Sequence, residues 1–302
     1  MSVNGLILAL FAAIAFAAGA VFARRGVAQT GEAFTAVIVS VFIGVPFFAI
    51  STSIAGEWDV LWTLSRQALI LLGLAGIVHY VGGRLLSYTA YRLIGANKAS
   101  AFSMTTPFYT IIFGFIFLSE AITISLILGT ISIFAGAMLV SLEKKNVSPG
   151  EHGRFFRTEA TGILTALGGA LCWGISPILI RPVVAEIGSP NAAALVTYVV
   201  ASMVMAGFLF RKKHRDQLIR PSFFTALLAL VISGLFNNIA HLLNFTALIN
   251  TPASIVTPIL GTNVIFIVFF SFLFNRKIEV FTSKVILGIV ATVIGTTLIF
   301  YF

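Results

Sequence analysis

Ten long apolar stretches follow one another along this chain of 302 residues, and they constrain its fold more than any other feature. A helix that crosses a lipid bilayer needs about 20 mostly apolar residues. Charged residues make up only 10% of the chain and hydrophobic residues 59%, which is not the composition of a water-soluble globule. Membrane β-strands would give short alternating segments instead. The sequence therefore predicts an all-α integral membrane protein with transmembrane helices at approximately 4–23, 34–55, 68–90, 98–118, 122–142, 159–180, 191–210, 222–247, 253–274 and 282–301.

These stretches leave no room for a soluble domain. The longest polar segment, EKKNVSPGEHGRFFRTE, has about 17 residues and is predicted to be a linker. Cys172 is the single cysteine and cannot form an internal disulfide. The N-terminal residues MSVNG lack the basic region of a cleaved signal, so 4–23 is expected to be a retained first span.

The net charge of +9 does not indicate nucleic-acid binding, because the basic residues lie mainly in short loops between spans. Sixteen of them fall in the loops after the odd-numbered spans and two, Arg66 and Arg181, in the loops after the even-numbered spans. Basic residues collect on the cytoplasmic side of membrane proteins. The sequence therefore predicts a multi-pass protein of the cell membrane with both termini outside.

The second half of the chain repeats the first. At a shift of 157 residues, FAAGAVFAR (16–24) lies over WGISPILIR (173–181), and Arg84 lies over His241. Near the end of each half the shift is 159, where EAITISLILGTISIFAG (120–136) lies over EVFTSKVILGIVATVIG (279–295). We expect one five-helix repeat in 1–145, a cytoplasmic linker in 146–158 and a second five-helix repeat in 159–302. An odd number of spans inverts the second copy, which is typical of secondary transporters with a midplane site between the repeats.

Three features resemble the drug/metabolite transporter superfamily, specifically its EamA branch. They are WGISPILIR, the pair YTAYRLIGANKASAFSMTTP and FTALINTPASIVTP, and an acidic residue followed by Gly-x6-Gly at the end of each half. The first span departs from the pattern, with Phe16 where the sixth has Trp173. The resemblance implies ten helices around a central cavity lined by the first, third, fourth, sixth, eighth and ninth. It also implies transport of small organic solutes, often export of amino acids or other metabolites.

Arg84 lies inside the predicted third span, and a charged side chain at mid-bilayer costs roughly 3 to more than 10 kcal/mol. We expect it to face an aqueous cavity; the alternative is that it snorkels to the cytoplasmic headgroups. His79, five residues away, is expected to point about 140° around an α-helix and to contact a neighbouring helix. It is then either a structural or a ligand-binding histidine. Spacing places four further side chains on the face of Arg84: Tyr80, Ser87, Tyr88 and Tyr91.

A second polar face is predicted in the eighth span, where Asn237, His241 and Asn244 have the spacing i, i+4, i+7. It serves either interhelical hydrogen bonds or a solute. Other candidates for the site are Trp173, Ser176, Thr105, Thr106, Thr257 and Asn263. Pro107 and Pro258 each follow a threonine; they fit either helices kinked beside a midplane site between the repeats or ordinary membrane-helix prolines.

All ten Asp and Glu residues fall in loops or at helix ends, so no carboxylate is expected at mid-membrane. Small multidrug-resistance relatives rely on a membrane glutamate, which argues against a cationic-drug antiporter. Arginine favours carboxylate or phosphate groups, of which solutes with a carboxylate fit best. The sequence thus predicts a secondary transporter of small organic metabolites, an exporter of amino acids or other carboxylate-bearing solutes by alternating access.

Two alternatives stay open: a non-transporting membrane sensor or scaffold, and an exporter of neutral or hydrophobic drugs. An enzyme is not expected, because the chain has no zinc-type His-Glu cluster and no paired aspartates. No cofactor or metal is expected. The expected partners are a small-molecule solute and the lipid bilayer. The chain is expected to be a monomer or a homodimer, and the glycines at 129, 136, 288 and 295 are expected to pack the fifth and tenth spans as scaffold or as a dimer surface.

Overall fold

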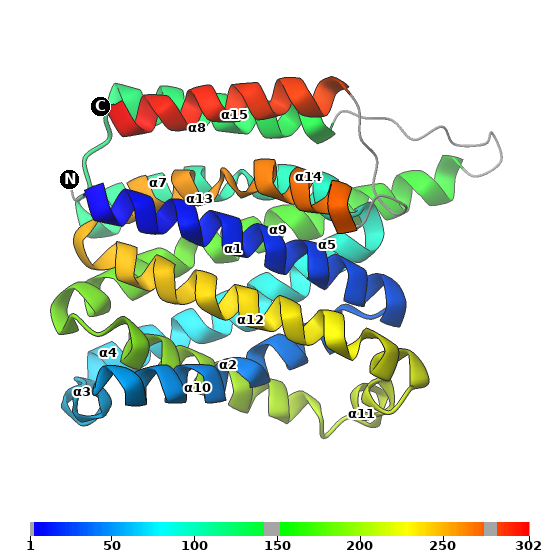
Figure 1. Ribbon diagram of the computed structural model, residues 1–302, viewed down its shortest axis with the longest axis horizontal. Coiled ribbons are helices and arrows are strands. Elements are labelled where there is room, and N and C mark those ends of the chain that lie inside the picture. Colours follow the sequence, from blue (N-terminus) through cyan, green and yellow to red (C-terminus); the bar gives the residue numbers. More distant parts are fainter. Residues whose placement is uncertain (1–2, 142–151, 275–282, 302) are drawn as a thin grey trace.

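The computed structural model describes residues 3–141, 152–274 and 283–301, and every regular element in these ranges is a helix. The helices lie roughly along one axis of the molecule (Figure 1). They are α1 (Val3–Thr30), α2 (Ala33–Ala55), α3 (Trp58–Thr63), α4 (Arg66–Gly76), the π-helix η1 (Ile77–Gly83), α5 (Arg84–Ile94), α6 (Ala96–Ser103), α7 (Thr106–Leu118), α8 (Ile124–Ser141), α9 (His152–Ile187), α10 (Pro190–Phe208), α11 (Lys212–Leu218), α12 (Pro221–Asn250), α13 (Ala253–Leu260), α14 (Asn263–Phe274) and α15 (Ser283–Tyr301).

The predicted all-α membrane architecture is confirmed. Within the described residues, seven helical stretches are long and apolar enough to cross a bilayer: Asn4–Thr30, Ala33–Ala55, Arg66–Ile94, Arg157–Ile187, Pro190–Phe208, Pro221–Asn250 and Ala253–Phe274. The three other predicted spans fall on the paired helices α6 and α7, on α8 and on α15. Several helices continue past the apolar stretch; α9 begins at His152, inside the segment expected to be a linker. A helix satisfies its own backbone hydrogen bonds on either side of the membrane surface, so the surface does not end it.

The helices pack as two related sets. Helix α1 lies along α12, and α9 lies along η1 and α5. The 157-residue shift places α1 over α9 and the span Arg66–Ile94 over α12. Each of the two contacts is therefore the repeat counterpart of the other: the first span of one half packs on the third span of the other half. Helices α1 and α9 also run in opposite directions along the long axis (Figure 1). This is the packing expected of two inverted halves.

Glycines allow some helices to approach each other closely. A Cβ atom on Gly19 of α1 would lie 2.6 Å from Nδ2 of Asn237 on α12. Between α8 and α15, a Cβ atom on Gly129 would lie 2.6 Å from the carbonyl oxygen of Gly295. Small residues let membrane helices pack at short distance. Gly129 and Gly295 therefore join two helices of the same chain as scaffold, and they are not available as a dimer surface.

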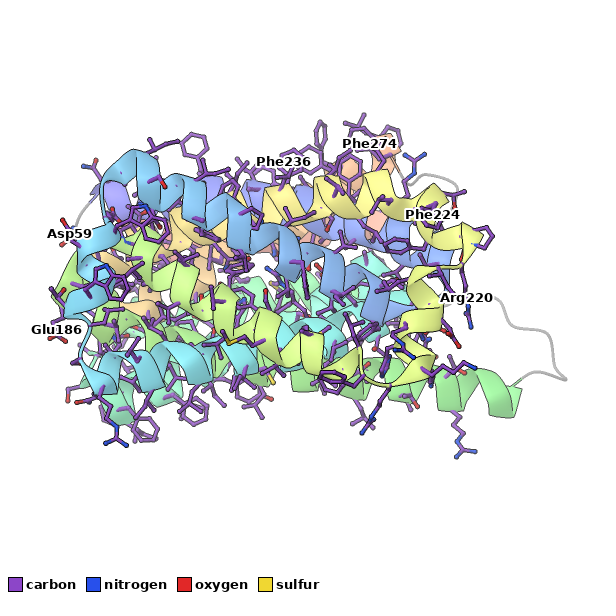
Figure 2. The ribbon with its side chains drawn as sticks, turned by 90° about the horizontal axis from the view of Figure 1, so that it is seen from below. Asp59, Glu186, Arg220, Phe224, Phe236 and Phe274 are labelled. Atoms are coloured by element: carbon purple, nitrogen blue, oxygen red, sulfur yellow. The ribbon has the colours of Figure 1, made fainter. Side chains whose placement is uncertain are left out.

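The outer face of the bundle is apolar. Ile124 on α8 and Leu287 on α15 are 78% and 60% exposed. Figure 2 shows Phe236 and Phe274 projecting from an outer face. Outer surfaces this apolar suit contact with the acyl chains of lipids. The two ends of the bundle differ in charge, with Asp59 and Glu186 at one and Arg220 at the other (Figure 2).

Candidate functional site

A cavity lies between the two halves; its empty space, counted together with the adjoining open solvent, is about 880 Å³. Its walls come from α1, the span Arg66–Ile94, α6 with α7, α9, α12, and α13 with α14. These are the six segments that the resemblance implied. The lining residues are Phe16, Ala20, His79, Arg84, Tyr88, Tyr91, Ser103, Met104, Thr106, Pro107, Trp173, Pro177, Asn237, His241, Asn244, Thr257, Leu260, Gly261 and Asn263.

Arg84 is 2% exposed and is the only Lys, Arg, Asp or Glu among the lining residues that the structure describes. Its Nη1 donates to Oγ of Ser40 at 3.0 Å, and its Nη2 donates to the hydroxyl of Tyr198 at 2.7 Å. No carboxylate of the described residues lies within ion-pair distance of it. The guanidinium therefore stays in the protein interior, which excludes snorkelling to the headgroups.

The tyrosines around Arg84 separate into two groups. Tyr88 and Tyr91 line the cavity, as expected. Tyr80 does not: it is 1% exposed and its ring centroid lies 4.7 Å from the guanidinium carbon of Arg84 and 4.1 Å from the ring centroid of Tyr198. Tyr80 and Tyr198 thus place their π faces near a buried cation, an arrangement that partly replaces its lost hydration.

The expected direction of His79 is wrong, because the helix around it is not an α-helix. Residues Ile77–Gly83 form a π-helix, in which the backbone N–H of Arg84 donates to the carbonyl of His79. Hydrogen bonds in this geometry join residues five apart, so His79 and Arg84 come to the same face. His79 consequently lines the cavity, with its ring centroid 4.7 Å from that of His241.

Trp173 and Ser176 on α9 have different positions. Trp173 lines the cavity, whereas Ser176 is 1% exposed and lies outside the lining. The hydroxyl of Ser176 is 2.5 Å from Nδ1 of His79, so it holds that imidazole in place. The close approach of Trp173 on the same helix requires Gly83, where a Cβ atom would lie 2.6 Å from Nε1 of Trp173.

The polar face of α12 lines the cavity with all three predicted residues, Asn237, His241 and Asn244. Nδ2 of Asn237 donates to the carbonyl of Ser233 at 2.8 Å and lies 3.5 Å from the hydroxyl of Tyr88. Part of this face thus serves structure. His241 and Asn244 each keep a buried side-chain atom without a hydrogen-bond partner among the described residues.

Two interrupted spans complete the wall. Helices α6 and α7 are separated at Met104 and Thr105, and α13 and α14 at Gly261 and Thr262. Pro107 is the second residue of α7, and Pro258 lies inside α13. The lining residues at these breaks include Thr106, Thr257 and Asn263. Discontinuous helices at a midplane cavity are typical of secondary transporters.

Five buried polar atoms in the cavity wall have no partner among the residues that the structure describes: Trp173 Nε1, His241 Nδ1, Asn244 Oδ1, Thr257 Oγ1 and Asn263 Oδ1. Buried polar groups in proteins are nearly always hydrogen-bonded, to protein, water or a ligand. The concentration of unpaired groups here indicates that the cavity is hydrated or takes a polar solute.

Sequence comparison agrees with this architecture. The EamA-like transporter family matches the chain twice, over residues 3–142 and 160–301. The chain belongs to this family. The "Uncharacterized transporter in cobO 3′ region" of Sinorhizobium sp. is 31% identical over 143 residues, which cover 47% of this chain and 99% of that protein. A solved crystal structure covers 99% of this chain and 96% of its own, with a TM-score of 0.70 and 15% identity, and shows the same fold.

This EamA-like transporter holds Arg84 with two residues that sequence reasoning missed. Ser40 comes from α2 and Tyr198 from α10, two spans outside the cavity wall. A lone tyrosine in the apolar stretch VTYVVASMVM was the available signal, because a buried phenol usually needs a hydrogen-bond partner.

A buried acidic residue was missed as well. Glu120 is 7% exposed, and its carboxylate accepts from the backbone N–H groups of Ala253 and Ser254 at 2.9 and 2.8 Å. It also lies 3.4 Å from Nε of Arg181. Glu120 therefore neutralises the N-terminus of α13, where the helix dipole favours an anion, and joins the two halves at one end of the bundle.

Proposed function

We propose that this EamA-like transporter exports amino acids or other solutes that carry a carboxylate, and that Arg84 binds the carboxylate. The observation that carries the proposal is the charge of the cavity wall. Arg84 is the one charged side chain among the described lining residues, and no described carboxylate pairs with it. A guanidinium has five N–H donors, and Ser40 and Tyr198 each accept from one nitrogen. The remaining donors suit a carboxylate of the solute.

The rest of the cavity fits a solute with a second polar group. Asn244, Thr257 and Asn263 contribute oxygen atoms that lack a partner among the described residues, and such oxygens accept from an ammonium or hydroxyl group. Apolar surface from Phe16, Met104 and Leu260 is available for a hydrocarbon side chain. An amino acid combines these three features in one small molecule.

Alternating access is supported by the arrangement of the halves. The cavity lies between two inverted sets of helices, and the two interrupted spans, α6–α7 and α13–α14, both reach its wall. A break in a helix allows its two parts to move separately while the cavity stays between the repeats.

The test compares ligand pairs on purified protein in detergent. Binding of several amino acids and of their neutral amides is measured by calorimetry for the unaltered chain, Arg84→Lys and Arg84→Ala. We expect Arg84→Ala to weaken binding of the acids by about 10- to 150-fold, since a charge-assisted contact contributes about 1.5–3 kcal/mol and each 1.4 kcal/mol is tenfold. Arg84→Lys retains the charge but not the planar guanidinium that can donate two parallel hydrogen bonds to a carboxylate, and it should lose part of the affinity. Exposed Arg66→Ala is the matched control and should bind normally.

Two outcomes would overturn the proposal. Equal binding of acids and amides, unchanged by Arg84→Ala in a protein that is still folded, would favour the apolar wall and the alternative of a neutral or hydrophobic substrate. Binding of an acid without counterflow of the labelled acid in proteoliposomes would favour a sensor that does not transport.

A further inference from the structure

The connections after the second and seventh spans are counterparts in the repeat but differ in chemistry. The 157-residue shift places Trp58 of α3 over Arg215 and Glu57 over His214. Helix α3 exposes Trp58 and Trp62, while α11 and the residue before it carry four basic side chains, Arg211, Lys212, Lys213 and Arg215. The two helices lie at opposite ends of the bundle (Figure 1).

These four cations are all exposed, and none is within ion-pair distance of a carboxylate in the described part of the chain. Asp216 is the one acidic residue in α11 and is half-buried. Arg220, just beyond the helix, differs because its Nη1 lies 3.9 Å from Glu32. The helix thus presents four positive charges that the described acidic residues do not neutralise.

The opposite face of α11 fixes the helix to the bundle. The ring of His214 stacks on Phe34 of α2 with centroids 4.2 Å apart, and Gln217 is only 4% exposed. His214, Gln217 and Leu218 have the spacing of one helical face. Because this face of α11 packs against the bundle, the basic side chains on its other face point into the surroundings of the protein.

Apolar side chains flank the cations. Phe210 and Ile219 are 88% and 72% exposed, and Phe224, at the start of α12, is 63% exposed. Figure 2 shows Phe224 and Arg220 at the same end of the molecule. Exposed aromatic and aliphatic groups beside Lys and Arg are the two components that bind a helix to the interface of an anionic leaflet. A purely aqueous partner would explain the cations but not these three side chains.

We propose that Arg211, Lys212, Lys213 and Arg215 form a binding site for the headgroups of anionic phospholipids, with Phe210, Ile219 and Phe224 in the adjoining acyl region. The lipid stabilises the folded chain by binding it and not the unfolded chain. The site is separate from the central cavity and does not depend on which solute the cavity takes.

The test measures the thermal unfolding midpoint of the purified full chain in neutral detergent micelles that contain either phosphatidylglycerol or phosphatidylcholine. Phosphatidylglycerol should raise the midpoint relative to phosphatidylcholine, and added salt should reduce the difference. The variant R211Q/K212Q/K213Q/R215Q should lose most of this difference with an unchanged midpoint in phosphatidylcholine. The double variant K212Q/K213Q should lose about half of it, and R211K/R215K should keep it, because the charge is retained.

The control variant K144Q/K145Q/R154Q/R157Q also removes four positive charges. It should keep most of the difference between the unfolding midpoints in phosphatidylglycerol and phosphatidylcholine. The proposal is overturned if the quadruple α11 variant responds to phosphatidylglycerol as the unaltered chain does. It is also overturned if the control variant loses as much as the α11 variant, because the response would then report the total charge and not this site.

Discussion

The hydroxyl of Tyr198 lies 2.7 Å from Nη2 of Arg84 and accepts its hydrogen bond. Tyr198 belongs to α10 in the second half of the chain, and Arg84 begins α5 in the first. The contact therefore joins the halves directly behind the cavity wall. Because Arg84 also lines the cavity, the same guanidinium takes part in packing and is available to a solute.

Tyr198→Phe removes this acceptor while keeping the ring that packs on Tyr80. We expect the free energy of unfolding to fall by about 1.5–3 kcal/mol, the range for a hydrogen bond to a charged group. Thermal unfolding in detergent measures the change. The matched control is Tyr109→Phe on α7, whose hydroxyl has no hydrogen bond to a described residue. Similar midpoints for the two variants would mean that the Arg84–Tyr198 contact adds no stability.

Glu120→Gln keeps the size of the side chain but removes its charge. The buried carboxylate then no longer neutralises Arg181 or the N-terminus of α13, and Arg181 keeps an unpaired charge. We expect a loss of about 2–4 kcal/mol of unfolding free energy. Exposed Glu186→Gln, at the end of α9, is the control and should change stability little. If the two variants have the same thermal unfolding midpoint, the contacts of Glu120 between the two halves do not stabilise the fold.

Gly129→Ala should destabilise the protein by about 1–3 kcal/mol, because the added methyl group meets the backbone of α15 and cannot be relieved by a side-chain rotation. Gly207→Ala in α10 is the comparison, since a Cβ atom there meets nothing within 4 Å. Thermal midpoints of the two variants in the same detergent provide the measurement. A Gly129→Ala midpoint at or above that of Gly207→Ala would contradict the close packing of α8 and α15.

The basic residues predict the orientation in the membrane. In a Cys172→Ser background, we expect Asp59→Cys to react with an impermeant maleimide on intact cells and Lys213→Cys to react only after lysis. The ends of α1 and α15 nearest the termini lie at the same end of the bundle as α3, so the result for Asp59 also reports the side of both termini (Figure 1). The opposite labelling pattern would reverse the predicted topology.

The sequence was sufficient to predict which residues share a face wherever the helix is a regular α-helix. Asn237, His241 and Asn244 share a face of α12 because that helix is continuous from Pro221 to Asn250. His79 was not predictable in the same way, because a π-helix changes which residues share a face. Periodicity assumes one helical geometry, and in the segment that departs from it His79 contacts Ser176 and Gly83 lies against Trp173.

The sequence alone determined that the chain is a helical membrane protein built from two related halves, because span length, charge bias and the 157-residue repeat are properties of the chain itself. Only the tertiary structure decided what surrounds the charged groups. Ser40 and Tyr198 lie 44 residues before and 114 residues after Arg84, and Glu120 contacts a backbone 133 residues away. A buried charge takes its partners from whichever helices the packing brings beside it, and that choice depends on the shapes of all the helices together.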